Sequence, residues 1–263
     1  MPHLPSLLWN SPLVDLKPKL QDCVDHALSH ARLPLPVQVF FRADDIGAPG
    51  KRLFRLLDLF LDCQTPLCLA VVPSWLSRQR WDIFQKTDQK APGLWCWHQH
   101  GWRHFTYEIQ GKKQEFGPAR TIDAIRQDIV RGREKLELVM KDRFTPVFTP
   151  PWNRCDVRTL AVLKNNGFKA VSRHRQSMPK SPKGLPDFAV NVDLHTRRDS
   201  SPEAGWQSLW KELSKAISSG TCGIMIHHQR MNDAAFEFLK VLLDVMTQNP
   251  HILPVHFKVM LHA

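Results

Sequence analysis

The sequence predicts an α/β fold in which parallel strands form a barrel and helices cover its outside. Short apolar runs, typical of buried strands, alternate with segments that carry apolar residues at helical spacing. Seven or eight such units in 263 residues match a (β/α) barrel, which needs about 250 residues. No repeat or linker divides the chain, so a single domain of residues 1–263 is expected. The expected strands lie at residues 37–41, 67–72, 94–98, 146–149, 169–172, 189–193, 223–227 and 255–260.

Several expected helices have recognisable ends. Residues 51–62 carry apolar side chains at helical spacing, and residues 121–140 do so after Thr121, a residue type that caps helices. Residues 99–119 and 173–187 fit neither pattern and are expected to be long loops, which are often functional in compact domains. Other helix starts and stops are Asp156 with Asn166-Gly167, Ser201-Pro202 with Gly220, and Asn232 with Met246.

Composition argues against several classes of protein. The formal charge is +11, but Lys and Arg are spread along the chain, so a nucleic-acid partner is not expected. No apolar stretch is long enough to span a bilayer, and the first 20 residues lack the layout of a secretory signal. The six cysteines are scattered with no C-x-x-C pair, which favours reduced, buried thiols. We therefore expect a cytoplasmic protein, and the sequence leaves its oligomeric state open.

Histidine and aspartate gather where the expected strands end. Asp44-Asp45 follow the first strand, and the histidine-rich residues 98–104 follow the third. In a parallel barrel the carboxyl ends of the strands form the rim that holds the active site. These side chains are therefore expected to meet there, although each pattern alone is more often a cap, a turn or packing. Polar residues also follow later strands, at Thr149 and Arg154, Asp193 and His195, and His227-His228.

His100 and His104 are four residues apart, a spacing that puts both imidazoles on one face of a helical turn. Two histidines and one carboxylate make a metal site with open positions, which zinc hydrolases use and which also suits iron. The adjacent carboxylates of Asp44 and Asp45 repel each other, and a cation offsets this repulsion. One of the two is therefore expected to bind a divalent metal, while the other stays ionised as a base.

Four segments resemble motifs of the polysaccharide deacetylases, the NodB-homology carbohydrate esterases of family 4. Residues 43–47, ADDIG, resemble the T-F-D-D-G motif, and residues 100–104, HGWRH, resemble H-(S/T)-x-x-H. Residues 148–154, FTPPWNR, resemble R-x-x-P-(Y/F/W), and residues 224–227, IMIH, resemble L-x-H. Order and spacing agree from about residue 37 to residue 230.

Two positions depart from these motifs. Gly101 stands where the second motif has Ser or Thr, and Thr149 stands where the third has an arginine that orients the catalytic aspartate. Arg42 or Arg154 could replace that arginine. The two departures do not affect the residues that match the metal ligands of the motifs. They leave the third motif without the arginine that orients the catalytic aspartate.

The resemblance implies a distorted (β/α)7 barrel and a metal-dependent mechanism. Asp45, His100 and His104 would bind the metal, expected to be zinc, and Asp44 would be the general base. The metal would polarise the amide carbonyl and lower the pKa of a bound water.

The resemblance also implies roles for residues of the third and fourth motifs. The backbone N–H of Trp152 would help to stabilise the oxyanion, with Arg154 and Trp102 near the substrate. His227 would protonate the leaving amine, and Asp193 would hold His227 in its charged form.

Further tryptophans and histidines flank these motifs. Trp95, Trp97, Trp102 and Trp152 suit stacking on a sugar ring, but one of Trp95 and Trp97 is expected in the core. His98 and His228 are expected to support the site or to pack, rather than to bind the metal.

Three functions fit these residues. The first is a hydrolase of carbon–nitrogen bonds that removes an acyl group, most often acetyl, from an N-acylated sugar or glycan precursor. The second is a hydrolase of another small amide, such as a cyclic ureide or imide. The third is a non-catalytic carbohydrate-binding protein, which the missing arginine favours and the complete set of ligands opposes. A soluble glycan precursor is preferred because no secretory signal is found.

Overall fold

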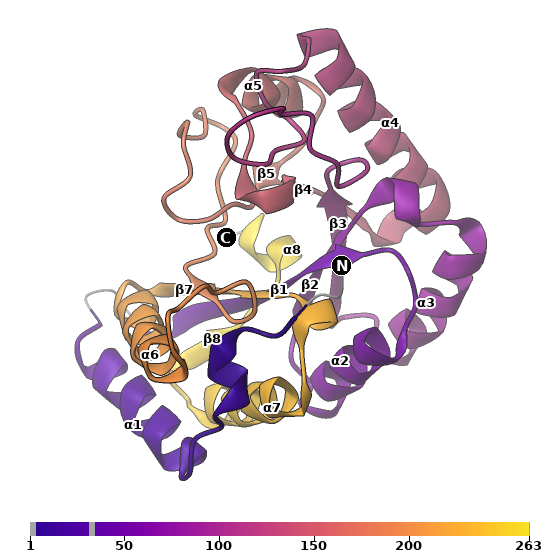
Figure 1. Ribbon diagram of the computed structural model, residues 1–263. Helices are drawn as coiled ribbons and strands as arrows, with labels where there is room; N and C mark the ends of the chain where they lie inside the picture. Colours follow the sequence, from indigo (N-terminus) through magenta and orange to yellow (C-terminus); the bar gives the residue numbers. More distant parts are fainter. Residues whose placement is uncertain (1–3, 32–34, 263) are drawn as a thin grey trace. The chain divides into compact units, whose positions relative to one another are not determined.

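The computed structural model describes residues 4–31 and 35–262 (Figure 1). These residues form two compact units that alternate along the sequence. The first comprises Met1–Ala43, Gly50–Leu67 and Asn191–His256, and the second comprises Asp44–Pro49, Cys68–Val190 and Phe257–Ala263. Strand β1 (Val37–Ile46) begins in the first unit and ends in the second. Asp44 and Asp45 therefore belong to the second unit.

The first unit is a parallel sheet with α-helices packed around it. Its elements are η1 (Leu7–Asn10), α1 (Leu16–Ser29), α2 (Lys51–Asp62), β6 (Val192–Asp193), α6 (Pro202–Ser218), β7 (Thr221–Ile226), η5 (His228–Arg230), α7 (Asp233–Gln248) and β8 (Ile252–Pro254). Strand β1 pairs in parallel with β8 on one side and β7 on the other, and β7 pairs with β6. Helix α1 packs against α6 and α7, beside which it lies in Figure 1.

The second unit contains the remaining strands, in the order β5, β4, β3, β2. Its elements are β2 (Leu67–Val71), η2 (Pro73–Trp75), α3 (Arg78–Lys90), β3 (Trp95–His100), α4 (Ile122–Met140), η3 (Lys141–Arg143), β4 (Phe144–Thr149), η4 (Pro151–Asn153), α5 (Val157–Asn165), β5 (Ala170–Val171) and α8 (Phe257–Met260). Strand β4 pairs in parallel with β3 and β5. Every residue of β3 is buried, as is typical of a parallel strand covered on both faces.

The expected alternation of strands and helices is confirmed. The side chains of Thr121, Asp156, Ser201 and Asn232 each accept the backbone N–H three residues further on, so all four predicted caps form. The predicted helix at residues 51–62 is α2. The six cysteines carry free thiols, as predicted, but the predicted burial holds for four of them, since Cys23 and Cys63 are half-buried. The described residues contain no helix with the length and apolar character needed to cross a membrane.

Two predictions about local structure are wrong, and two helices were missed. Residues 255–260 do not form a strand, because the last strand, β8, ends at Pro254 and helix α8 begins at Phe257. Strand β1 continues to Ile46, so the two aspartates lie within the strand rather than after it. Helices α1 and α3 were not predicted. In α3 the apolar pattern is sparse, since Trp81 and Phe84 are its buried large apolar residues.

Candidate metal centre

Asp45, His100 and His104 come together in the second unit. Asp45 Oδ1 lies 3.3 Å from His100 Nε2 and 3.1 Å from His104 Nε2. A metal can be bound by the side chains of His, Cys, Asp and Glu. Within residues 4–31 and 35–262, these three residues are the one group of three such side chains whose ligand atoms all lie within 4.8 Å of one another. Asp45 and His100 are buried, and the His104 side chain is 17% exposed. The predicted ligand residues are thus brought together.

The route of the chain to this group differs from the prediction. His100 is the last residue of β3, and residues 101–104 do not form a helical turn. Gly101 and His104 instead adopt left-handed backbone angles, with φ of 57° at each. These angles fold the chain back so that His104 meets His100, their ring centroids 5.2 Å apart. The prediction of a helical turn was wrong, although the two imidazoles are neighbours.

A hydrogen bond from Nδ1 orients the His100 ring with Nε2 toward Asp45. His100 Nδ1 lies 2.9 Å from the carbonyl oxygen of Thr149, which can only accept, so Nδ1 is the protonated nitrogen. Nε2, the nitrogen that faces Asp45, then carries the lone pair in the neutral ring. Metal-binding histidines commonly donate their second N–H to a carbonyl in this way.

The two histidines have pKa values that move in opposite directions. Burial lowers the pKa of His104 to about 4, and the opposing charge of Asp45 only partly compensates. Burial also lowers the pKa of His100, but the hydrogen bond to Asp45 and the charges of Asp44 and Asp45 outweigh it, so the net shift is upward. His104 is therefore neutral near pH 7 and offers a lone pair.

The donor set fits a divalent metal such as zinc. Metal–ligand bonds of about 2.0–2.1 Å at tetrahedral angles place neighbouring ligand atoms about 3.3 Å apart. The separations of 3.3 Å and 3.1 Å from Asp45 Oδ1 to the two ring nitrogens are close to this value. Two imidazoles and a carboxylate also leave a coordination position for water or substrate. These residues would hold the metal with little rearrangement.

Two half-buried tryptophans flank His104. The His104 ring lies 4.4 Å from the Trp152 ring and 5.9 Å from the Trp75 ring, measured between centroids. Trp75 was not singled out from the sequence, where nothing distinguishes it from the core tryptophans. Trp152 has φ of 56°, a conformation that is strained in a bulky residue and occurs mostly at functional sites.

The other predicted tryptophans are packed away. Trp102 is 5% exposed, and Arg131 covers its ring at 4.8 Å, so its predicted contact with substrate is not supported. Trp95 and Trp97 are each 1% exposed, so both lie in the core, where one of the two was expected. Trp97 donates its indole N–H to Asp88 at 2.9 Å.

Thr149 supports the histidines of β3. Its Oγ1 lies 2.9 Å from His98 Nε2, while its carbonyl binds His100. His98 is fully buried and lies outside the group of three. The guanidinium of Arg154 donates to the carbonyl of Lys113 at 3.2 Å, which ties it to the loop before α4. Arg42, in the first unit, donates to Met225 Sδ at 3.2 Å.

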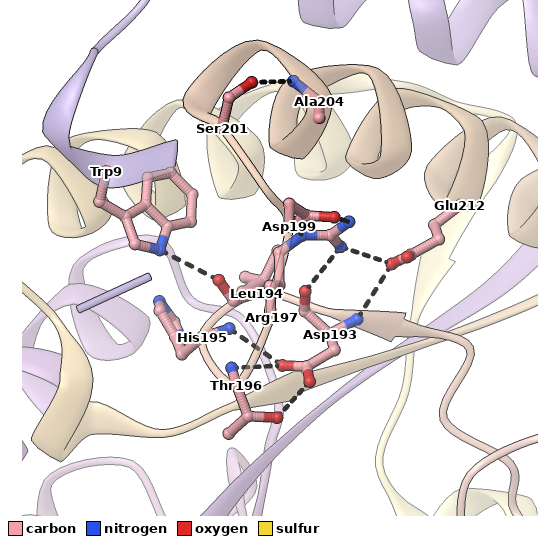
Figure 2. Close-up of polar contacts among 10 residues, drawn as sticks. All are labelled: Trp9, Asp193, Leu194, His195, Thr196, Arg197, Asp199, Ser201, Ala204 and Glu212. Atoms are coloured by element: carbon pink, nitrogen blue, oxygen red, sulfur yellow. Dashed lines mark hydrogen bonds and ion pairs between the residues drawn. The ribbon is translucent and has the colours of Figure 1, made fainter. Parts of the chain in front are cut away.

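In the first unit, the predicted pair of Asp193 and His227 is not formed. The Asp193 carboxylate accepts the N–H groups of His195 and Thr196 at 3.0 and 2.9 Å, and also the Thr196 hydroxyl (Figure 2). Strand β6 ends at Asp193, and an aspartate at the start of a turn commonly binds the following N–H groups. His227 donates its backbone N–H to His195 Nδ1 at 3.2 Å, and its own Nδ1 is buried with no hydrogen-bond partner among the described residues.

His195 is expected to make the protein less stable in acid. Burial, with the nearby charges of His227, His228 and Arg230, lowers the pKa of His195 well below 6.5. As the pH falls below about 6.5, the unfolded chain takes up a proton that the folded one does not, so stability is lost. One such proton changes the free energy of unfolding by up to about 1.4 kcal/mol per pH unit.

A His195→Asn variant isolates this effect, because its amide can still accept the N–H of His227 without titrating. Urea unfolding at about pH 7 and about pH 5.5 measures the change. Between these two pH values, the free energy of unfolding is expected to fall by about 1 kcal/mol more in the wild-type protein than in the variant. Equal losses would show that His195 titrates normally in the folded protein.

Comparisons with known proteins identify solved structures with a similar fold. No protein-family model and no curated protein matches the sequence. A Mycobacterium smegmatis protein assigned as a polysaccharide deacetylase superposes with a TM-score of 0.65 at 14% identity, over 88% of this chain and 91% of that one. A family 4 acetyl xylan esterase of Clostridium thermocellum, solved with cobalt, gives 0.50 at 12% identity, over 82% and 87%. A family 4 pseudoenzyme of Bacillus anthracis gives 0.52 at 10% identity, over 84% and 64%. The chain thus has the (β/α)7 fold of the polysaccharide deacetylases, as the sequence predicted.

Proposed function

We propose that this protein is a metal-dependent hydrolase that removes an acyl group, in the first place acetyl, from an N-acylated sugar or glycan precursor. The observation that carries the proposal is the group of Asp45, His100 and His104, whose donor atoms and separations suit zinc. A zinc ion bound there would supply Lewis-acid activation of water and of the amide carbonyl. The fold shared with deacetylases and esterases supports the same chemistry.

Asp44 is the proposed general base. Side chains of successive strand residues normally point to opposite faces, but Asp45 has φ of 63°, which breaks this alternation in β1. The charges of Asp44 and Asp45 both raise the pKa of His100. Asp44 is 2% exposed and lies outside the group of three proposed ligands, so the metal would not need its carboxylate as a ligand, and Asp44 is assigned the role of base.

Trp75 and Trp152 are the proposed contacts for the sugar ring. Both are half-buried and both lie against the His104 ring, so their faces are near the reacting group. Aromatic side chains offer a large apolar surface for packing against the C–H face of a sugar. The Trp152 N–H and Arg154 remain proposed for the oxyanion and the substrate. His227 remains the proposed acid, but without the carboxylate partner first assigned to it.

A non-catalytic carbohydrate-binding protein is the second candidate. Thr149 stands where the related motif has an arginine, and its hydroxyl binds His98 instead. One protein of the same fold is a pseudoenzyme, and a mutant of that protein has restored enzymatic activity. Retention of both aspartates and both ligand histidines favours the enzyme.

Acetate release from a panel of substrates tests the proposal. The zinc-loaded protein is incubated with N-acetylated mono- and oligosaccharides and, separately, with cyclic ureides and imides, whose ring opening is followed directly. Protein stripped with a chelator is the control. We expect acetate from at least one sugar with zinc and none without it. If only the cyclic amides were hydrolysed, the protein would be a cyclic-amide hydrolase and not a sugar deacetylase. Sugar binding without any turnover would favour the non-catalytic carbohydrate-binding protein.

A further inference from the structure

The segment that carries His104 to the metal site is held by one buried carboxylate. Glu115 accepts the backbone N–H groups of three consecutive residues, Trp102 at 3.2 Å, Arg103 at 2.7 Å and His104 at 3.2 Å. The Glu115 side chain is fully buried. Three converging N–H donors satisfy a buried carboxylate, which would otherwise be costly to remove from water.

Gly101 makes room for this carboxylate. A Cβ atom at Gly101 would lie 2.3 Å from Glu115 Oε2 and 2.6 Å from Pro151 Cγ, closer than real Cβ atoms approach other atoms. Gly101 also has φ of 57°, which glycine adopts at little cost. Gly101 is the position at which the related motif carries Ser or Thr. A side chain there and the Glu115 carboxylate would occupy the same space.

We propose that Glu115 is a positioning residue that replaces the missing side chain at Gly101 and holds His104 Nε2 toward Asp45. The inference rests on the proposed metal-binding function. The bond to the His104 N–H fixes the backbone of the ligand itself, and the bonds to Trp102 and Arg103 fix the two residues before it. Glu115 lies 11 residues after His104, so it ties the far end of the loop to the site.

Two further hydrogen bonds hold the start of this loop. The Gln99 amide donates to the Gly101 carbonyl at 3.0 Å, and the Ser74 N–H donates to the Trp102 carbonyl at 3.0 Å. These bonds hold the carbonyl groups of the segment, whereas Glu115 holds the N–H groups. Loss of Glu115 would therefore free the backbone around His104 without unfolding the strand before it.

The test compares zinc affinity in Glu115→Ala, Glu115→Gln and Glu108→Gln. Glu108 lies in the same loop and accepts the N–H of Ala119, so it is a matched control that does not touch residues 102–104. Competition with a chromophoric chelator gives the zinc Kd, and amide hydrogen exchange of the zinc-free protein reports on residues 102–104. We expect a Kd about 10–100-fold higher in Glu115→Ala, the usual effect of losing an outer partner of a ligand. Glu115→Gln, which keeps one acceptor oxygen, should fall between Ala and wild type.

In Glu115→Ala, faster amide hydrogen exchange at residues 102–104 should accompany the weaker zinc binding. Glu108→Gln should match the wild-type protein in both the exchange rate and the zinc Kd. If Glu115→Ala does not fold, the nearly isosteric Glu115→Gln carries the test. A variant that loses stability but binds zinc within twofold of wild type would show a merely structural role and overturn the inference. Absence of zinc binding by the wild-type protein would instead overturn the proposed function, and this inference with it.

Discussion

Replacing Asp44 with asparagine is expected to lower the rate of amide hydrolysis by about 10²–10⁴-fold, the usual contribution of a general base. Asparagine has nearly the shape of aspartate but cannot take up a proton. Asp44 is buried and outside the group of three ligands, so zinc should remain bound. The measurement pairs kcat on an N-acetylated sugar with the zinc content of the same sample.

Asp123→Asn is the matched control, because Asp123 lies exposed in the first turn of α4 and pairs only with Arg126 in the described structure. It should keep both zinc and rate. Hydrolysis by Asp44→Asn as fast as by the wild-type protein would rule out the assignment of the base. Loss of zinc from Asp44→Asn would instead move Asp44 into the set of ligands.

Removal of a ligand should abolish metal binding. Asp45→Ala and His104→Ala each delete one of three donors, and we expect the zinc Kd to rise more than about 100-fold, beyond the effect of losing an outer partner. The affinity is measured by chelator competition, with circular dichroism to establish that the variants are folded. His174→Ala, at an exposed histidine of the same unit, is the control and should bind zinc normally. Unchanged affinity in both ligand variants would place any bound zinc elsewhere.

Local chemistry explains why much of the fold could be predicted from the sequence. A side chain such as Asp156 or Asn232 begins a helix by binding an N–H only three residues away, so the signal and the structure lie together. Buried parallel strands such as β2 are continuously apolar and stand out in the same way. Residues 255–260 show the limit, because a short apolar segment fits a strand or a helix equally well.

The candidate site was harder to predict than the fold, because its geometry depends on contacts between residues that are distant in the sequence. The motif spacing correctly brought Asp45, His100 and His104 together, but the helical turn expected between the histidines is absent. The backbone there is set by left-handed angles at Gly101 and His104, and by Glu115 in a loop that has no periodic pattern. Residues 115–117, EFG, can be noticed beside the other motifs, but the sequence does not show that Glu115 binds the backbone of residues 102–104.

Residues of the same type that look equivalent in the sequence differ in their burial and in their contacts. Trp102 and Trp152 both flank motif residues, yet one is covered by Arg131 and the other lies half-buried against His104. Asp193 lies at the end of a strand, close to the place expected for Asp44, but it binds the backbone of its own turn. Burial of this kind follows from the packing of neighbouring elements, which residue type and spacing do not encode.

The zinc content of the wild-type protein tests the central claim most directly. The protein is purified without chelators, dialysed against excess zinc and then against buffer, and its metal is measured by mass spectrometry. Asp45, His100 and His104 as the ligands predict about one zinc ion per chain. A folded protein that retains no zinc after this treatment would contradict the proposed hydrolase and leave the non-catalytic carbohydrate-binding protein as the better account.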